Sequence, residues 1–170
     1  EEEVIEKSAQ VLGDKLSRLM QEKKIATGSK IMFVNDGSRD NTLFLLHGIA
    51  ARDTLFSVVS LAGNYGHQSA ILAGMMTARK HADVVVTIDA DLQQDIEALD
   101  RFLESYMEGC EVVYGVRNDR HSDGMFKKGT ATLYYSLMHL LGSKVITNHA
   151  DYRLMSKKAL DAMAEYKETN

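Results

Sequence analysis

Apolar residues recur along this chain at two alternating spacings, one helical and one extended. Over residues 1–24 they recur at helical spacing, which predicts an amphipathic helix that begins almost at residue 1. We predict strands at 30–34, 56–61, 84–88 and 111–116, with helices that end near residues 51 and 81 and a third at about 96–107. This alternation is typical of an α/β domain in which helices flank a mostly parallel sheet.

After residue 116 the pattern changes. A basic loop is followed by a predicted long helix at about 123–141, a short extended piece at 144–148 and a final helix from about Ser156. No repeat, low-complexity segment or linker interrupts the sequence. A chain of 170 residues is long enough for a substantial core, so we expect a single domain over residues 1–170.

The composition limits the class of protein. Hydrophobic residues make up 45% of the chain and charged residues 26%, which is ordinary for a soluble globular domain. No apolar run approaches the length that spans a bilayer, so we expect these residues to be soluble and cytosolic. The single cysteine, Cys110, excludes an internal disulfide, and its apolar neighbours predict a place in the core. The formal net charge of −4 argues against nucleic acid as a partner.

The most informative stretch is ADVVVTIDADLQQD, residues 82–95. Its β-branched run predicts a strand buried on both faces, and Asp89 and Asp91 follow where that strand should end. Ligands of parallel sheets gather beyond the carboxyl ends of the strands, and side chains two apart on an extended chain point the same way. The two carboxylates predict a site for Mg²⁺ or Mn²⁺ that keeps open positions for phosphate oxygens. Acidic residues often merely end a strand, which is the alternative to a metal site. The surrounding sequence is needed to choose between the two.

A second polar group follows the predicted strand at 30–34. Asn35 and Asp36 open the loop VNDGSRDNT, in which Gly37 allows a sharp turn. A carboxylate at a strand end in this architecture commonly accepts hydrogen bonds from a ribose or a base. A simple polar turn is the alternative. We expect this strand end and the one before Asp89 to open on the same edge of the sheet.

Four blocks occur in a fixed order: VNDGSRDNT, NYGHQSAILAGMMTA, DVVVTIDADLQQD and DYRLMSKKAL, with YGVRNDR as a weaker fifth. The ordered set resembles the inverting family 2 glycosyltransferases of GT-A fold, specifically the polyprenyl-phosphate sugar transferases. The resemblance spans essentially residues 1–170. It implies that a hexose moves from a nucleotide sugar, with a UDP-hexose as the favoured donor, to a polyprenyl phosphate at the cytoplasmic face of the cell membrane, in cell-envelope glycan synthesis.

The resemblance also implies roles for individual residues. Asp89 and Asp91 would be the DxD motif that holds Mg²⁺ or Mn²⁺ on the donor diphosphate, whose negative charge builds up as the glycosidic bond breaks. Asp151 and Arg153 would lie at the acceptor side of the reaction centre, with Asp151 as the proposed base. The residues expected to contact the nucleotide sugar are Asn35, Asp36, Asn64, Gly66, Asp89 and Gln93.

The chemistry of the acceptor leaves the role of Asp151 open. A sugar hydroxyl must lose a proton and needs a base, whereas a lipid phosphate is already ionised near neutral pH. For a phosphate acceptor, Asp151 would chiefly orient Arg153 or the acceptor, and a plain helix cap or arginine partner is the alternative. His67 is expected to start a helix rather than to bind metal, because no second histidine lies at ligand spacing.

Basic residues gather in RNDRHSDGMFKKG, residues 117–129. Positive charge would offset the repulsion between a lipid phosphate and a sugar diphosphate, and arginine forks suit phosphate oxygens. Charge runs are more often solvated faces, which is the alternative. The residues expected to bind the acceptor phosphate are Arg117, Arg120, Lys127 and Lys128.

Other classes of protein fit less well. A calcium loop of the EF-hand type needs glycine where this chain has Gln94, and neither GxGxxG nor GxxxxGK[ST] occurs. A glycosyltransferase with a saccharide hydroxyl acceptor, a sugar nucleotidyltransferase and a non-catalytic carbohydrate-binding module remain open.

Two departures from the family pattern concern the ends of the chain. The family normally begins with a strand that ends in a VPVYNE-like motif, and its members commonly continue past the RLMSKKAL block into membrane-associated helices. We therefore expect a fragment of a longer protein that lacks the first strand and the C-terminal membrane region. The full protein is expected at a membrane surface, with a homo-oligomer as one option.

Overall fold

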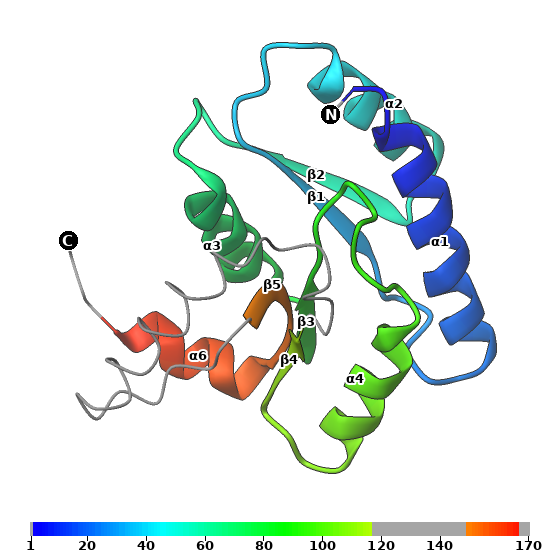
Figure 1. The fold of residues 1–170 in the computed structure, drawn as a ribbon, viewed down its shortest axis with the longest axis vertical. Helices are drawn as coiled ribbons and strands as arrows, with labels where there is room; N and C mark the ends of the chain where they lie inside the picture. Colours follow the sequence, from blue (N-terminus) through cyan, green and yellow to red (C-terminus); the bar gives the residue numbers. More distant parts are fainter. Residues whose placement is uncertain (1, 117–148, 167–170) are drawn as a thin grey trace, which may run out of the picture.

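Helices and strands alternate through most of the chain in the computed structural model, which describes residues 2–116 and 149–166 (Figure 1). The predicted helix at 123–141 and the extended piece at 144–148 lie outside these residues. The elements are α1 (Ile5–Gln21), β1 (Ile31–Asn35), α2 (Thr42–Arg52), β2 (Phe56–Ser60), α3 (His67–Ala78), β3 (Val84–Thr87), α4 (Ala98–Met107), β4 (Val112–Val116), β5 (His149–Ser156) and α6 (Lys157–Glu165).

The strands form two sheets. β1 pairs with β2 in parallel, from Ile31 opposite Phe56 to Asn35 opposite Ser60. β5 lies between β3 and β4 and is antiparallel to both, so β3 and β4 run in the same direction. The predicted α/β class, with parallel strands flanked by helices, is confirmed.

β5 itself was not predicted as a strand. Burial alternates over residues 151–154, with Tyr152 and Leu154 buried and Arg153 between them only partly so, and Met155 and Ser156 are buried as well. The short run of polar and charged residues hides that alternation in the sequence. The helix expected from about Ser156 is confirmed, because the Ser156 hydroxyl caps α6 by accepting a hydrogen bond from the Ala159 amide at 3.0 Å.

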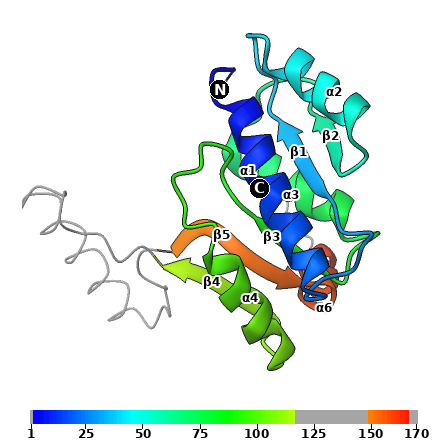
Figure 2. The ribbon, with the colours of Figure 1, turned by 90° about the vertical axis from the view of Figure 1, so that its right-hand side faces the viewer.

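Apolar side chains pack in three groups on the strands. Ile5 and Ala9 of α1 pack with Phe33 of β1 and with α2, and Figure 2 shows α1 running beside β1. α3 and α6 share a second group around Met75 and Leu160, and α4 covers β3, β4 and β5 in a third. The amino end of α3 lies between the carboxyl ends of β1 and β3, because Asp36 after β1 binds the Gly66 amide and Asp89 after β3 lies 3.8 Å from His67.

Ionic contacts hold the segment after β3 against α1. The Lys15 ammonium is buried and binds the carboxylates of Glu97, at 2.8 Å, and of Asp100. The Ser8 hydroxyl donates to the Ala90 carbonyl between the two aspartates of the DADLQ motif. Lys24 adds a second ammonium on Asp100. α1 therefore restrains the loop that carries Asp89 and Asp91.

Two expectations about burial are wrong. Cys110 is exposed rather than part of the core, because it lies in the turn after α4, where Gly109 has a φ of +102°. The residues of β3 are partly buried rather than buried on both faces. None of the helices within 2–116 and 149–166 is long and apolar enough to cross a membrane.

Candidate functional site

Asp36 joins the end of β1 to the loop before α3. Its carboxylate accepts hydrogen bonds from the amides of Tyr65, at 2.7 Å, and Gly66, at 2.9 Å. Gly37 has a φ of +65°, and a Cβ on it would lie 2.5 Å from the carbonyl carbon of Gly63, so the two loops touch backbone to backbone. Asp36 thus shapes the loop that was expected to lie beside the nucleotide, and its own contact with a nucleotide stays a prediction.

The neighbouring asparagines also shape these loops. Asn35 is buried, and its Nδ2 donates to the Ser60 hydroxyl at 3.1 Å while its Oδ1 accepts from the Ser38 amide at 3.4 Å. Asn64 accepts a hydrogen bond from the Gly66 amide at 3.2 Å. These contacts fix the carboxyl ends of β1 and β2, and within residues 2–116 and 149–166 they leave part of the hydrogen-bonding capacity of both asparagines unused.

Asp89 is held by Gln94 after the end of β3. The Asp89 amide donates to Oε1 of Gln94 at 2.9 Å, and its Oδ2 accepts from the Gln94 side-chain amide. Gln93, the glutamine expected at the donor, is exposed, and its backbone amide donates to Oδ1 of Asp91 at 3.0 Å. Leu92 adopts a φ of +58°, which turns the chain sharply between Asp91 and Gln93. The role of Gln94 was missed because the two glutamines are adjacent and only this turn distinguishes them.

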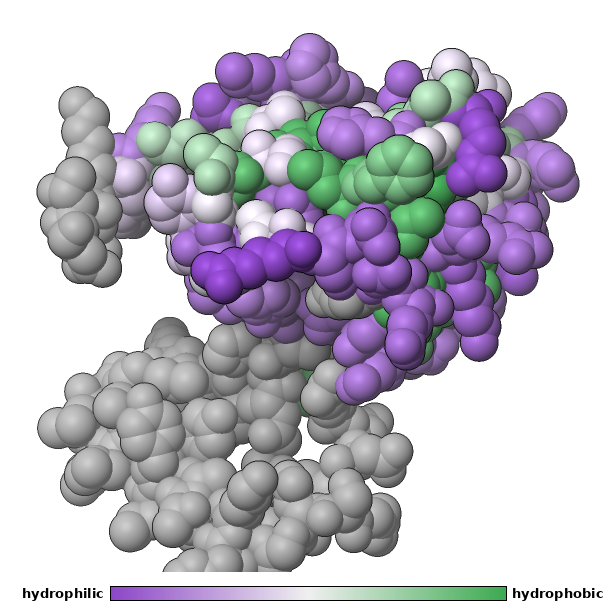
Figure 3. Space-filling model, turned by 90° about the horizontal axis from the view of Figure 1, so that it is seen from above, coloured by the Kyte–Doolittle hydropathy of each residue, from purple (hydrophilic) through white to green (hydrophobic). Residues whose placement is uncertain are grey.

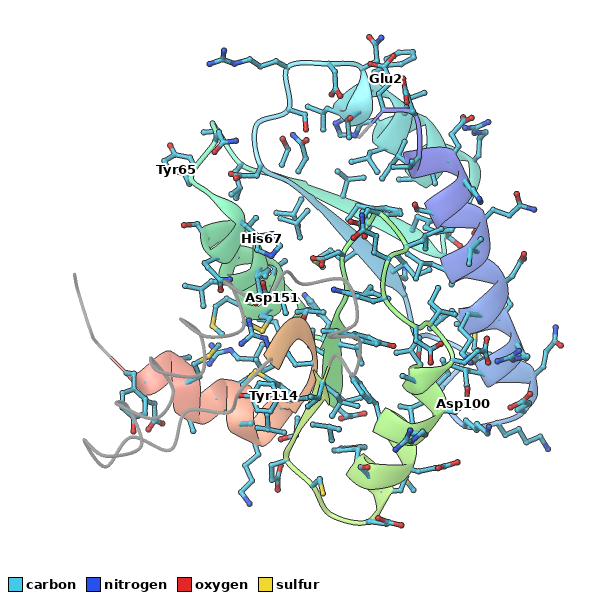
Figure 4. All side chains as sticks on the ribbon, viewed as in Figure 1. Glu2, Tyr65, His67, Asp100, Tyr114 and Asp151 are labelled. Carbon is cyan, nitrogen blue, oxygen red and sulfur yellow. The ribbon has the colours of Figure 1, made fainter. Side chains whose placement is uncertain are left out.

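The carboxylate of Asp151 is surrounded by donors from α3 and β5. His67 Nε2 lies 2.9 Å from Oδ2, and Gln68 Nε2 lies 3.2 Å from Oδ1 and 3.3 Å from Oδ2. Arg153 places a guanidinium nitrogen 3.4 Å from Oδ1. Figure 4 shows His67 and Asp151 side by side between α3 and β5.

Burial raises the pKa of the Asp151 carboxyl, but these surroundings outweigh it. Hydrogen bonds from Gln68 and His67 and the charge of Arg153 leave the pKa of Asp151 below its usual value. Asp151 is therefore ionised at neutral pH and is a weak base.

Pairing of β3 with β5 brings the two ends of the candidate site together. Thr87 lies opposite Arg153, and the Thr87 hydroxyl donates to the Asp151 carbonyl at 2.5 Å. His67 Nε2 also lies 3.8 Å from Oδ1 of Asp89. The structure therefore gathers Asp89, Asp151 and Arg153 around the start of α3. Among the described residues, the buried Nε of Arg153 has no hydrogen-bond partner.

The metal expected at Asp89 and Asp91 would depend on few protein ligands. Residues 2–116 and 149–166 contain no group of three or more His, Cys, Asp or Glu side chains that could hold a metal ion. Mg²⁺ is commonly bound through one or two carboxylates together with substrate phosphates, so the exposed Asp91 and the partly exposed Asp89 fit such a cation when a diphosphate completes the shell.

The remaining sequence-predicted residues and one hollow among the described residues lie elsewhere. Arg117, Arg120, Lys127 and Lys128 are outside the described residues. A hollow of about 680 Å³ is lined by residues such as Asp83 and Ser156, at the opposite ends of β3 and β5 from the candidate site. Figure 3 shows the molecule from above, with a band of hydrophobic side chains set among hydrophilic ones.

Comparison with known proteins identifies the family. Residues 10–163 match the family model described as glycosyl transferase family 2. Over all 170 residues the chain is 46% identical to the uncharacterized glycosyltransferase YkoT of Bacillus subtilis, covering 50% of that protein. It is 39% identical to YkcC of the same organism over 83% of the chain and 43% of the relative. It is 34% identical to the bactoprenol glucosyl transferase of Shigella phage SfX over 83% of the chain and 46% of the relative.

The chain thus spans about half the length of the curated relatives it matches. The family model covers nearly all of it, from α1 to α6, and so includes every described residue of the candidate site. The resemblance expected from the four sequence blocks is confirmed, and the chain belongs to glycosyl transferase family 2.

Proposed function

We propose that the full protein is an inverting glycosyltransferase that moves a hexose from a UDP-hexose to a polyprenyl phosphate with the help of a divalent cation. The observation that carries this proposal is the meeting of Asp89, after β3, with Asp151 and Arg153 of β5 around the start of α3. A carboxylate for the donor side and a carboxylate with a guanidinium for the acceptor side then share one edge of the fold.

The relatives support the acceptor class. The phage SfX relative is named a bactoprenol glucosyl transferase, and so is its counterpart in phage SfV at 34% identity. Such a name pairs transfer of a glucosyl group with a polyprenyl lipid. By this likeness, the acceptor that we propose is a polyprenyl phosphate and the transferred group is a hexose.

The low basicity of Asp151 fits a phosphate acceptor better than a hydroxyl acceptor. A carboxyl with a lowered pKa is poorly suited to remove a proton from a sugar hydroxyl. A lipid phosphate needs no such base because it is already ionised. Asp151 would then serve to orient Arg153, whose guanidinium would bind phosphate oxygens.

On the donor side, Asp89 and Asp91 would hold the cation, and Asn35, Asp36, Asn64, Gly66 and Gln93 would line the nucleotide sugar. When bound, the cation would offset the negative charge that develops on the departing diphosphate. Gln94 keeps the Asp89 carboxylate in one orientation. On the acceptor side, Arg117, Arg120, Lys127 and Lys128 would add positive charge at the cytoplasmic face of the membrane.

Membrane vesicles that contain the full-length protein provide the test. Labelled UDP-glucose, UDP-N-acetylglucosamine and GDP-mannose are offered with undecaprenyl phosphate, with Mn²⁺ or with EDTA. We expect label from one UDP-sugar in the organic phase, only when both the lipid phosphate and the cation are present, and loss of that transfer in Asp91→Ala. Label in a water-soluble saccharide, or sugar-nucleotide synthesis from a nucleoside triphosphate, would refute the proposal.

A further inference from the structure

His67 stands between two carboxylates that come from different strands. Its Nε2 lies 2.9 Å from Oδ2 of Asp151 and 3.8 Å from Oδ1 of Asp89. Only the first distance is that of a hydrogen bond. Because an ionised carboxylate only accepts hydrogen bonds, Nε2 of His67 is the donor to Asp151, while Asp89 stays outside hydrogen-bond reach.

The side chain of Gln68 also binds the Asp151 carboxylate. Its side-chain nitrogen lies within 3.3 Å of both oxygens of Asp151. Two consecutive residues of α3 thus fix the carboxylate against rotation, one on Oδ2 and one across both oxygens. The carbonyl of Asp151 is also held, by the Thr87 hydroxyl of β3.

The start of α3 is itself anchored from the other side. Asp36 binds the amides of Tyr65 and Gly66, the two residues that precede His67. Gly66 is the N-cap of α3, and its φ of +89° needs a residue without Cβ. A chain of hydrogen bonds therefore runs from the end of β1, through the first turn of α3, to Asp151 on β5.

We propose that His67 is a positioning residue which, together with Gln68, holds the Asp151 carboxylate in the orientation that the acceptor side of the reaction requires. This inference rests on the proposed function, because it gives Asp151 a part in sugar transfer. His67 touches neither donor nor acceptor in this role. It acts through Asp151, and through Asp151 on the guanidinium of Arg153.

This role differs from that of a metal ligand. An Nε2 that carries a proton toward Asp151 has no lone pair for a cation. Loss of His67 is therefore expected to slow sugar transfer while leaving cation binding at Asp89 and Asp91 in place. If His67 were a metal ligand, its loss would weaken cation binding first, and transfer would fall as a result.

The test uses the full-length protein in membrane vesicles with the variants His67→Ala and His67→Gln. Glutamine is the conservative variant because its amide N–H reaches about as far as Nε2. His81→Ala removes an exposed histidine just beyond the other end of α3 and serves as the control. We expect His67→Ala to lower kcat by about 10- to 100-fold with little change in donor KM, as loss of a supporting hydrogen bond commonly does. His67→Gln should recover most of that loss, and His81→Ala should match the wild type.

Two further measurements distinguish a positioning role of His67 from that of a metal ligand or of a residue that acts independently of Asp151. Mn²⁺ affinity in the presence of UDP, followed by electron paramagnetic resonance, should be the same in wild type and His67→Ala. In an Asp151→Asn background, His67→Ala should lower kcat by less than about threefold more, because its partner is already altered. Wild-type kcat in His67→Ala, no recovery in His67→Gln, loss of Mn²⁺ binding, or independent effects of the two changes would overturn the proposal.

Failure of the proposed function gives a different result. In that case the wild-type protein itself transfers no sugar to a lipid phosphate. The contact can then still be judged from thermal melts of wild type, His67→Ala, Asp151→Asn and the double variant. Melting-temperature losses that are less than additive support the contact, and fully additive losses contradict it.

Discussion

Replacing Asp100 by asparagine tests whether ionic contacts hold the loop after β3 against α1. Asp100 lies in α4 and binds the ammonium groups of Lys15 and Lys24. Asparagine keeps the size of the side chain and one acceptor oxygen but removes the charge. The substitution therefore isolates the electrostatic part of the contact between α1 and the segment that follows the DADLQ motif.

The magnitude follows from the pKa of this carboxyl. Hydrogen bonds from Lys15 and Lys24 lower the pKa of Asp100 from 3.8 to about 2. Such a difference corresponds to about 2 kcal/mol of folding free energy at neutral pH. Since 21% of the side chain is exposed, water screens part of the attraction, and we expect a loss of about 1–2 kcal/mol in Asp100→Asn.

The pH dependence has a definite sign. The pKa is lowered in the folded state, so the stabilisation is present above the ordinary pKa of 3.8 and is lost as the pH falls through about 2. The difference in stability between wild type and Asp100→Asn should therefore be constant near neutral pH and should shrink below pH 4, reaching about half its value near pH 3.

Urea denaturation followed by circular dichroism, at several pH values, measures this difference. Glu104→Gln is the control, because Glu104 is an exposed residue of the same helix, and its effect should stay within about 0.5 kcal/mol. A loss in Asp100→Asn that equals the control, or one that does not change between pH 7 and pH 3, would refute the ionic explanation.

Three further substitutions test local features of the site and its supports. Gly37→Ala should destabilise the fold by about 1–3 kcal/mol in thermal melts, because the φ of Gly37 is +65° and a Cβ would collide with the facing loop. Gly28→Ala is the control and should be neutral, because no atom lies within 4 Å of a Cβ at that position. Gln94→Ala removes both hydrogen bonds to the first aspartate of DADLQQD and should weaken Mn²⁺ binding in the presence of UDP by about 10- to 100-fold, while Gln93→Ala should change it far less. Ser156→Ala removes the N-cap of α6 and should lower stability by about 1 kcal/mol in urea denaturation, and an unchanged midpoint would contradict that role.

Much of the fold was predictable because its elements have strong local patterns. The β-branched run before Asp89 and the apolar spacing of residues 5–19 locate a strand and a helix to within a few residues. Asn35 and Asp36 were expected where a strand ends, and they do lie at the end of β1. Each of these features depends on residues that are neighbours along the chain.

The arrangement around Asp151 was not predictable in the same way. Nothing near residue 151 indicates that β5 inserts antiparallel between β3 and β4, because strand pairing depends on partners far away in sequence. His67 was expected only as the start of a helix, and that expectation is confirmed. Its contacts with Asp89 and Asp151 arise from packing of α3 against β3 and β5, which no spacing in the sequence reports.

The place of β5 between β3 and β4 has a consequence for how the protein is made. During synthesis the chain emerges from its amino end, so β3 and β4 leave the ribosome well before the strand that joins them. The Thr87–Asp151 hydrogen bond closes a separation of 64 residues, and such distant pairings form slowly. Until β5 arrives, both strands keep open edges that can pair with other chains. The contacts of Asp151 with His67 and Thr87 therefore form only after residues 149–156 have been made.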